Sequence, residues 1–462
     1  MLLFVILGAK VIKRCKLCKK KQSIFRILMY LCTQHKMTLH MNIRMSIILS
    51  TGIIMARYGY DQMNPTLWLI LLLVLTSMAI VLRKWIQSQC ILFYICLFLL
   101  GGLLTSYQEC RNRKPVTYFT MDELSEQDRF LTTAQERRAE IEQKLKGLGI
   151  ENEDFGVIAA MAMGDKAALD KDTKEVYSVA GASHVLAVSG LHISIIFQLL
   201  IMLLGGNRRH IFVILSALVA IWMYVLFIGM PASAVRSATM LSVYGFVAMT
   251  RRNKDSLRSL SIAFTIMLLC NPLYLFDLSF QMSFAAVGSI IVFLPLLSSL
   301  YHPTHRLSQW IWGMLCVSAA AQIGTLPLIT YYFGRISCYS LLTTFIAIPA
   351  AMGILYLCCM LMLMSPFLLL SPTVSLFSWL ITWVAKALVV ITHFANTAFH
   401  LTSLAPGASI DEIHLPLPIL FIIYAALGLV YAGWIKMKRI RNKMARSQED
   451  FSPENALFTN YR

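Results

Sequence analysis

The chain has 462 residues, of which 58% are apolar and 14% are charged, and its mean hydropathy is +0.67. Soluble domains contain about 45–50% apolar and about 25% charged residues, so this composition excludes an ordinary water-soluble protein and a disordered one. The net charge of +18 is ambiguous, because cytoplasmic loops of membrane proteins collect Lys and Arg whatever the protein does. The positions of the charges are therefore more informative than their sum.

The N-terminal residues 1–44 are strongly basic, with ten Lys and Arg between Lys10 and Arg44 and no acid in that interval. They predict a basic cytoplasmic extension. Cys15 and Cys18 form an isolated C-x-x-C pair, and no second Cys/His pair follows at zinc-site spacing, so we expect no metal site and no cofactor. Most other cysteines lie in apolar runs, which does not indicate a disulfide framework.

Twelve apolar runs are candidates for crossing a bilayer core of about 30 Å as helices. They predict an all-α polytopic membrane protein with about twelve transmembrane helices, in which residues 45–107 form the N-terminal group. The runs are 45–58, 66–82, 89–107, 183–205, 211–229, 231–250, 259–276, 280–298, 310–330, 339–365, 373–395 and 416–435.

Basic residues fix the expected orientation of these helices. Every second loop is rich in Lys and Arg, as is the tail 436–462, whereas the intervening loops are poor in both or carry acids such as Asp61 and Asp411. The positive-inside rule therefore places the N- and C-termini in the cytoplasm. The basic loops contain Arg83 and Lys84, Arg208 and Arg209, Arg251 to Arg258, and Arg306.

Residues 108–182 form the one sizeable predicted extramembrane part. Residues 133–149 have helical periodicity with one charged face, and the apolar segment Phe155 to Met163 follows and ends at Gly164 and Asp165. This pattern predicts a helix that lies on the outer membrane surface.

Polar residues at membrane depth are costly and mark candidate sites. The run from 183 opens with two His and two Ser. On a helix, His184, Ala187, Gly190 and Leu191 share one side, while Ser189 and His192 are close enough to touch. The last pair permits an intramembrane hydrolase hypothesis. No G-x-S-x-G elbow and no orienting acid accompany it, so close helix packing is favoured and no catalytic residue is predicted.

Three further stretches interrupt the apolar pattern. Pro231 is predicted to start a helix that carries Arg236, whose side chain snorkels to the surface, lines a pore or finds a partner. A polar break from Asn271 to Phe284 contains Asp277, a candidate counter-charge for Arg236. Finally, the ninth run ends with a segment that contains Gln322 and Pro327.

These stretches resemble the membrane-embedded competence domain of the ComEC family, the DNA-internalisation channels of naturally transformable bacteria. Their order and spacing agree over roughly 155–400. The matching residues are Gly164 and Asp165, the run from His184 through S-G-L-H to His192, Pro231 to Arg236, Asn271 and Pro272 with Asp277, Phe280, Gln281, Ser283 and Phe284, and then Gln322, Thr325, Pro327, Phe333 and Gly334.

The resemblance implies a competence-type transmembrane channel domain over 157–435, in a multi-pass protein of the bacterial inner (plasma) membrane. It implies passage of single-stranded DNA into the cytoplasm during natural transformation, without enzymatic activity, through one subunit or a homodimer. The partners implied are membrane lipid, an extracytoplasmic DNA receptor and a cytoplasmic helicase-type motor. The alternative is a small-solute or lipid-linked-substrate transporter of the same fold.

The residues matched to the family motifs fall into two groups. Those expected to line the pathway are His184, Ser189, His192, Arg236, Asp277, Gln281 and Gln322. Those expected to have structural roles are Gly164, Asp165, Gly190, Pro231, Pro272 and Pro327.

Two departures from the family pattern stand out. Many members carry an OB-fold-like domain before the competence domain, but residues 108–156 are too few and too poor in strand patterning, so that domain is expected to be reduced or absent. Many also carry a C-terminal metallo-β-lactamase-like domain. No H-x-H-x-D-H run is present here, and His302 and His305 lie in a predicted cytoplasmic loop, so no nuclease site is expected.

Overall fold

The structure is a computed structural model that describes most of residues 39–450. Residues 1–38, 60–63, 82–85, 113–139, 206–210, 250–255, 371–374 and 451–462 lie outside the described part, as do a few positions between 141 and 166. The predictions for the N-terminal extension, for the pair Cys15 and Cys18, and for most of the basic loops therefore concern residues outside it.

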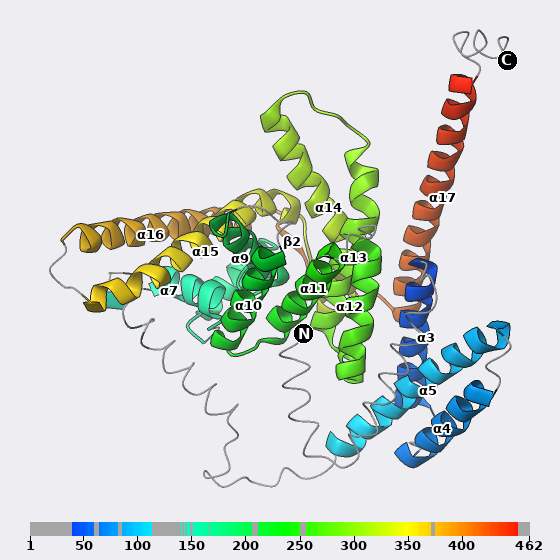
Figure 1. The fold of residues 1–462 in the computed structure, drawn as a ribbon. Coiled ribbons are helices and arrows are strands. Elements are labelled where there is room, and N and C mark those ends of the chain that lie inside the picture. Colours follow the sequence, from blue (N-terminus) through cyan, green and yellow to red (C-terminus); the bar gives the residue numbers. More distant parts are fainter. Residues whose placement is uncertain are drawn as a thin grey trace, which may run out of the picture. The chain divides into compact units, whose positions relative to one another are not determined.

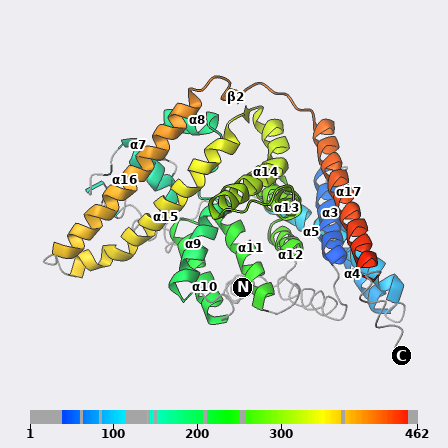
Figure 2. The same cartoon turned by 90° about the horizontal axis from the view of Figure 1, so that it is seen from above.

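The described chain is built from helices (Figures 1 and 2). Each of the twelve predicted runs overlaps one long helix. These helices are α3 (Leu39–Tyr58), α4 (Pro65–Val81), α5 (Ile86–Asn112), α9 (Gly190–Leu203), α10 (Ile211–Phe227), α11 (Ala232–Met249), α12 (Ser256–Cys270), α13 (Leu278–Ser298), α14 (Arg306–Phe333), α15 (Ser340–Leu370), α16 (Ser375–Ser403) and α17 (Leu417–Asp450).

Shorter elements join these helices. They are α7 (Asn152–Ile158), the π-helix η2 (Ala159–Met163), α8 (Lys171–Val179), the 3₁₀ helix η3 (Pro272–Phe276), and the strands β1 (Ile336–Ser337) and β2 (Ser409–Ile410). The two strands pair antiparallel, with Ile336 opposite Ile410.

Six described helices are long and apolar enough to cross a membrane, which identifies a membrane protein of all-α class. They cover Ile91–Asn112, Leu278–Ser298, Arg306–Phe333, Ser340–Met362, Trp379–Ser403 and Leu417–Met437. Other apolar helices, such as α9 and α10, are shorter than a full span. The number of twelve spans and the orientation of the termini stay predictions.

The chain divides into two compact units. Unit 1 contains the described residues up to Leu169, together with Ala187–Phe284 and Ala351–Thr392. Unit 2 contains Asp170–Leu186, Ala285–Ala350 and the described residues from His393 onward. Each unit is described by itself below.

Unit 1 has two buried clusters of apolar side chains. One joins α3, α5, α12 and the start of α13, where Leu49, Leu97 and Phe280 are almost fully buried. The other joins α9, α10 and α11 around Ile193 and Ile221. The second cluster also contains Ala234 and Ala238 of α11, and small residues such as these allow helices in a membrane to approach closely.

The segment predicted to lie on the membrane surface is instead part of the unit 1 interior. Residues Ile158 to Met163 are at most 3% exposed, so the surface-helix prediction is wrong for this part. The physical reason is that this stretch has no polar face to present to water or lipid headgroups. The Tyr224 hydroxyl of α10 donates a hydrogen bond of 2.7 Å to the Ala162 carbonyl and fastens the π-helix to the unit.

Unit 2 is organised around the crossing of α13 and α14. A Cβ atom on Gly324 would lie 2.5 Å from the Cβ of Ser289, so only glycine permits this approach. The Tyr424 hydroxyl of α17 donates to the Gly324 carbonyl at 2.6 Å. Pro327 lies inside α14, which ends at Phe333, three residues beyond the predicted end of the ninth run at 330.

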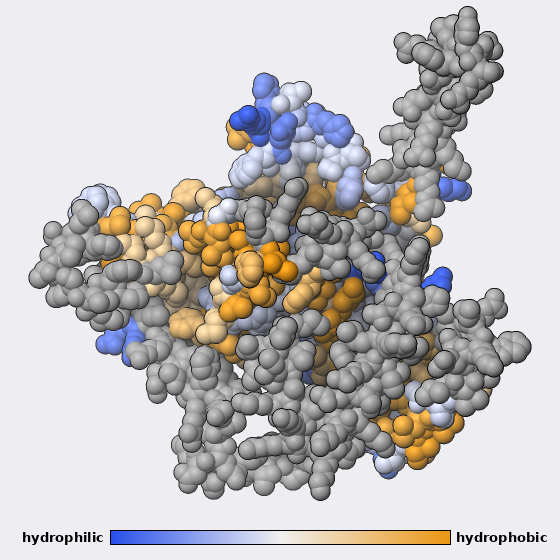
Figure 3. All heavy atoms as spheres, in the orientation of Figure 1, coloured by the Kyte–Doolittle hydropathy of each residue, from blue (hydrophilic) through white to orange (hydrophobic). Residues whose placement is uncertain are grey.

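Part of the polar surface of unit 2 lies at the turn between α13 and α14. Figure 3 shows hydrophilic surface there, near the top of the view, above helices with mainly apolar surface. The exposed side chains in this turn include His302, His305 and Arg306. This separation of polar turn and apolar helices is typical of a hairpin that leaves and re-enters a membrane.

Candidate functional site

Helix α9 begins at Gly190 and not at residue 183, because Ser189 ends the preceding irregular segment and caps the helix. The Ser189 Oγ lies 2.8 Å from the Nδ1 of His192, and the Ser189 backbone N–H donates to the same nitrogen at 3.2 Å. This is a capping box in which a histidine takes the place of the usual Glu or Gln. The expectation that His184, Ala187 and Gly190 share a helix face is therefore wrong.

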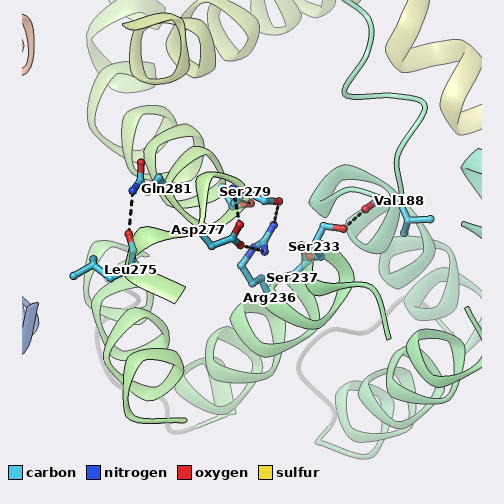
Figure 4. Close-up of polar contacts among 9 residues, drawn as sticks. Val188, Ser233, Arg236, Ser237, Leu275, Asp277, Ser279 and Gln281 are labelled. Atoms are coloured by element: carbon cyan, nitrogen blue, oxygen red, sulfur yellow. Dashed lines mark hydrogen bonds and ion pairs between the residues drawn. The ribbon is translucent and has the colours of Figure 1, made fainter. Parts of the chain in front are cut away.

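The start of α11 packs directly against this capped helix start. The Ser233 hydroxyl donates to the Val188 carbonyl at 2.5 Å (Figure 4). A Cβ on Gly190 would lie 2.9 Å from the Ser237 Oγ, so glycine allows the close approach of α9 and α11. Gly164 has a φ of +75° and lies against Val188, which brings the Gly164 and Asp165 motif to the same place.

Arg236 lies one helical turn from Ser233 on α11, as predicted for a helix that starts after Pro231. Its side chain is 3% exposed, which excludes snorkelling to the surface. The Nη1 atom lies 3.4 Å from the Asp277 Oδ2, and Nη2 donates to the Ser279 Oγ at 2.5 Å (Figure 4). The prediction that Asp277 is the counter-charge of Arg236 is confirmed.

The guanidinium of Arg236 is nevertheless only partly satisfied. A charge-assisted hydrogen bond between Arg and a carboxylate is about 2.7–2.9 Å long, so the 3.4 Å contact with Asp277 is loose. The buried Nε atom has no hydrogen-bond partner among the described residues. A buried polar atom without a partner costs about 1–3 kcal/mol, and more when the group is charged. Arg236 is therefore a buried cation that keeps unused hydrogen-bonding capacity.

The polar break between α12 and α13 provides the partners of Arg236. Asn271 caps η3 by accepting a 3.1 Å hydrogen bond from the Leu273 N–H, and Pro272 occupies the first position of that turn. Asp277 accepts a 3.3 Å bond from the Ser279 N–H at the start of α13, while Gln281 donates to the Leu275 carbonyl at 3.0 Å. Asp277 therefore caps a helix and balances a charge at once.

Five of the predicted pathway residues belong to this region of unit 1: Ser189, His192, Arg236, Asp277 and Gln281. The other two belong to unit 2, where His184 is exposed in the segment before α9 and Gln322 is half-buried in α14. Sequence reasoning missed the contacts of Ser233, Ser237 and Ser279. The signal for the first two was their four-residue spacing, which is typical of a tightly packed helix face.

The charge and donor groups of this arrangement suit an anion. No group of three or more His, Cys, Asp and Glu side chains among the described residues is placed to hold a metal ion. Arg236 is the cation of the cluster, and serine hydroxyls and backbone groups surround it. A guanidinium presents several donors in a planar fork, which suits carboxylate and phosphate oxygens.

These features define a helical membrane protein with a partly satisfied cation buried where capped helix starts meet. The competence protein family model matches residues 161–437, more than half of the chain, and the chain belongs to that family. The motifs described above all lie within or beside this range, so the resemblance found in the sequence is confirmed.

Two curated proteins are similar to the matched region. ComE operon protein 3 of Bacillus subtilis (strain 168) is 30% identical over 253 residues, which cover 52% of this chain and 30% of that protein. Recombination protein 2 of Haemophilus influenzae (strain ATCC 51907 / DSM 11121 / KW20 / Rd) is 24% identical over 233 residues, 46% of this chain and 28% of that protein. The matched part is thus less than a third of each relative. No solved structure matches the chain.

Proposed function

We propose that this chain is an inner-membrane channel component that passes single-stranded DNA into the cytoplasm during natural transformation. Membership of the competence family supports a role in DNA uptake, and the apolar helices support a multi-pass membrane location. In this proposal both termini are cytoplasmic, in agreement with the distribution of Lys and Arg in the sequence.

The observation that supports the proposal most directly is the burial of the loosely paired cation Arg236. A single strand has one phosphate per nucleotide, and its passage needs cations or oriented donors along the route. A buried charge in a transmembrane bundle is expensive and is retained for a function more often than for stability. Arg236 is 2% exposed, and its buried Nε has no hydrogen-bond partner among the described residues, so it keeps a donor for a phosphate oxygen.

The proposal includes no catalytic step. Ser189 and His192 are in contact, but their contact is accounted for by the cap of α9. The proposed driving force comes from partners, namely an extracytoplasmic DNA receptor and a cytoplasmic helicase-type motor. A transporter for a small anionic solute or a lipid-linked substrate is the alternative, because a guanidinium binds any phosphate or carboxylate.

The test is entry of labelled DNA into the cytoplasm of a host strain that lacks this gene and expresses variants of it. Arg236→Met removes the charge at similar volume, and it is expected to lower uptake at least 100-fold while the immunoblotted level in the membrane is unchanged. Arg236→Lys keeps a point charge without the planar fork and is expected to give intermediate uptake.

Arg335→Gln is the matched control, because Arg335 also binds a serine and carboxylates but is more exposed. Uptake in that variant is expected to stay within a few-fold of the unmodified protein. Normal uptake in the deletion strain would overturn the DNA channel. Normal uptake with Arg236→Met would remove Arg236 from the pathway, and a loss of another anion's transport in that variant would favour the alternative.

A further inference from the structure

Helix α16 has two faces of different character. One face is fully buried and apolar, with Ile381, Leu388 and Phe399 each at most 3% exposed. The opposite face carries large exposed side chains, among them Trp379, Trp383, Val390 and Phe394, each more than 50% exposed. The helix contains no Asp or Glu between Ser375 and Ser403.

Ionisable side chains form a line along this exposed face. Lys386, His393 and His400 follow one another at intervals of seven residues, and all three are exposed. Seven residues are about two helical turns and about 10 Å of rise, with a drift of only about 20°, so the three side chains lie nearly above one another. Thr397 lies between the two histidines and is also exposed.

This line runs through a segment that is apolar enough to cross a membrane, Trp379–Ser403. The exposed face of α10 in the same chain has a different composition. Its large exposed residues are apolar, with Phe212, Leu215, Val219 and Met223 47–77% exposed, and Ser216 is its exposed polar residue. None of them is ionisable. Because a polar or charged side chain in hydrocarbon costs free energy, the ionisable line of α16 is not explained by contact with lipid tails.

We propose that this face of α16 is a contact surface for the single strand inside the membrane, an inference that rests on the proposed function above. Lys386 attracts phosphate, and the histidines donate hydrogen bonds to phosphate and base atoms. The Thr397 hydroxyl donates to the His393 carbonyl at 2.8 Å, so its oxygen accepts hydrogen bonds from base N–H groups. The aromatic rings of Trp383 and Phe394 offer flat surfaces on which bases of any sequence stack. The absence of acids from the helix makes the whole face complementary to a polyanion.

The N-terminal part of α16 carries residues that also suit a membrane interface. Trp379, Trp383 and Lys386 are residue types that anchor helices at membrane interfaces, and the Lys386 Nζ lies 5.4 Å from the centroid of the Trp383 ring. Interface anchoring does not account for His393, which lies fourteen residues from Trp379, about 21 Å along the helix. His393 therefore distinguishes a strand contact from an anchor, whereas His400, three residues from the end of the segment, does not.

The decisive variant converts the line into a lipid-type face: Lys386→Leu, His393→Leu and His400→Leu together. If the face contacts lipid, this change leaves the membrane level and DNA uptake equal to or above those of the unmodified protein. If it contacts the strand, uptake of labelled DNA falls at least 10-fold at an unchanged membrane level. The matched control is Val219→Leu on the apolar face of α10, which is expected to leave uptake unchanged.

A photo-crosslinking amino acid gives a second, independent readout that does not need the triple variant to fold. Placed at Phe394, it is expected to crosslink to labelled DNA during uptake, whereas the same group at Val219 is expected not to. Full uptake by the triple variant, or no crosslink from position 394 in actively importing cells, overturns this inference and leaves the proposed function intact. Normal uptake in the deletion strain overturns the proposed function itself.

Discussion

Two arginines of this chain bind similar partners in opposite ways. Arg236 in unit 1 is 3% exposed in its side chain and holds one carboxylate at 3.4 Å and one serine hydroxyl. Arg335 in unit 2 is 29% exposed and holds two carboxylates, with Nη1 at 2.8 Å from Glu175 and Nε at 2.5 Å from Asp411. Arg236, the more deeply buried arginine, thus has the weaker ion pairing.

The Arg335 cluster is a structural clasp between segments of unit 2. It joins the end of α8, through Glu175 and the Ser178 hydroxyl, to Asp411 after β2. The hydrogen bonds that Arg335 donates to Glu175 and then to Asp411 raise the pKa of Arg335 above its already high value, so the clasp stays charged at every physiological pH. The N–H donors of Arg335 bind groups of the protein, whereas the buried Nε of Arg236 has no hydrogen-bond partner among the described residues.

The largest expected effect comes from removing the counter-charge of the buried arginine. Asp277→Leu leaves Arg236 without a carboxylate and removes the cap of α13, which is expected to cost about 3–5 kcal/mol and to lower the membrane level sharply. The double variant Arg236→Met with Asp277→Leu removes both charges and is expected to regain most of that level. Immunoblots of membrane fractions and thermal unfolding in detergent measure both effects.

DNA uptake separates stability from function in the same pair of variants. The double variant is expected to accumulate yet to import no labelled DNA, because the cation for phosphate is gone. If it imports DNA normally, the pair is structural and the contrast with Arg335 disappears. If Asp277→Leu alone accumulates normally, Arg236 has another acceptor and does not depend on Asp277 as its counter-charge.

A smaller effect is expected from the exposed clasp. Arg335→Gln loses two ion pairs that water partly screens, and is expected to lower stability by about 1 kcal/mol, with a smaller difference at high salt. Thermal unfolding in detergent at low and high salt concentration checks this expectation. A loss as large as that of Asp277→Leu would show that exposure does not distinguish the two arginines.

The sequence was sufficient for the helices and for a candidate partner of Arg236. Long apolar runs predict the helices because spacing and length are local properties. Asp277 was the candidate counter-charge of Arg236, but snorkelling and a pore-lining position stayed open until the burial of the side chain excluded snorkelling. The sequence misplaced the start of α9, since residues 183–189 are apolar enough for a helix and the cap at Ser189 outweighs that signal. The burial of Ile158 to Met163 depends on distant contacts such as that of Tyr224, which no local pattern contains.

A third prediction concerns the hydroxyl of Ser189, which distinguishes a cap from a nucleophile. Ser189→Ala removes the cap and is expected to cost about 1 kcal/mol, whereas Ser189→Asn keeps a capping oxygen and is expected to cost only a few tenths. Uptake is expected to follow stability, with Asn near the unmodified protein and Ala reduced. Complete loss of uptake in both variants, together with labelling by a serine-reactive probe, would instead indicate catalysis.

The last expected effect, similar in size to that of Ser189→Ala, tests how tightly the helix starts around Arg236 are packed. Gly190→Ala places a methyl group 2.9 Å from the Ser237 Oγ, which itself donates to the Ser233 carbonyl at 2.9 Å. Since α11 also carries Arg236, moving its first turns displaces the guanidinium from Asp277. We expect Gly190→Ala to lower stability by about 1 kcal/mol, after the gain in helix propensity that alanine brings.

The compensating variant is Ser237→Ala, because it removes the oxygen that the new methyl group meets. Gly190→Ala with Ser237→Ala is expected to return to within about 0.5 kcal/mol of the unmodified protein and to restore uptake, as coupled neighbours do in a double-mutant cycle. Additive losses would mean that α9 and α11 do not meet through these two residues. Restored stability without restored uptake would mean that the position of Arg236, and not only the packing around it, is what the pathway requires.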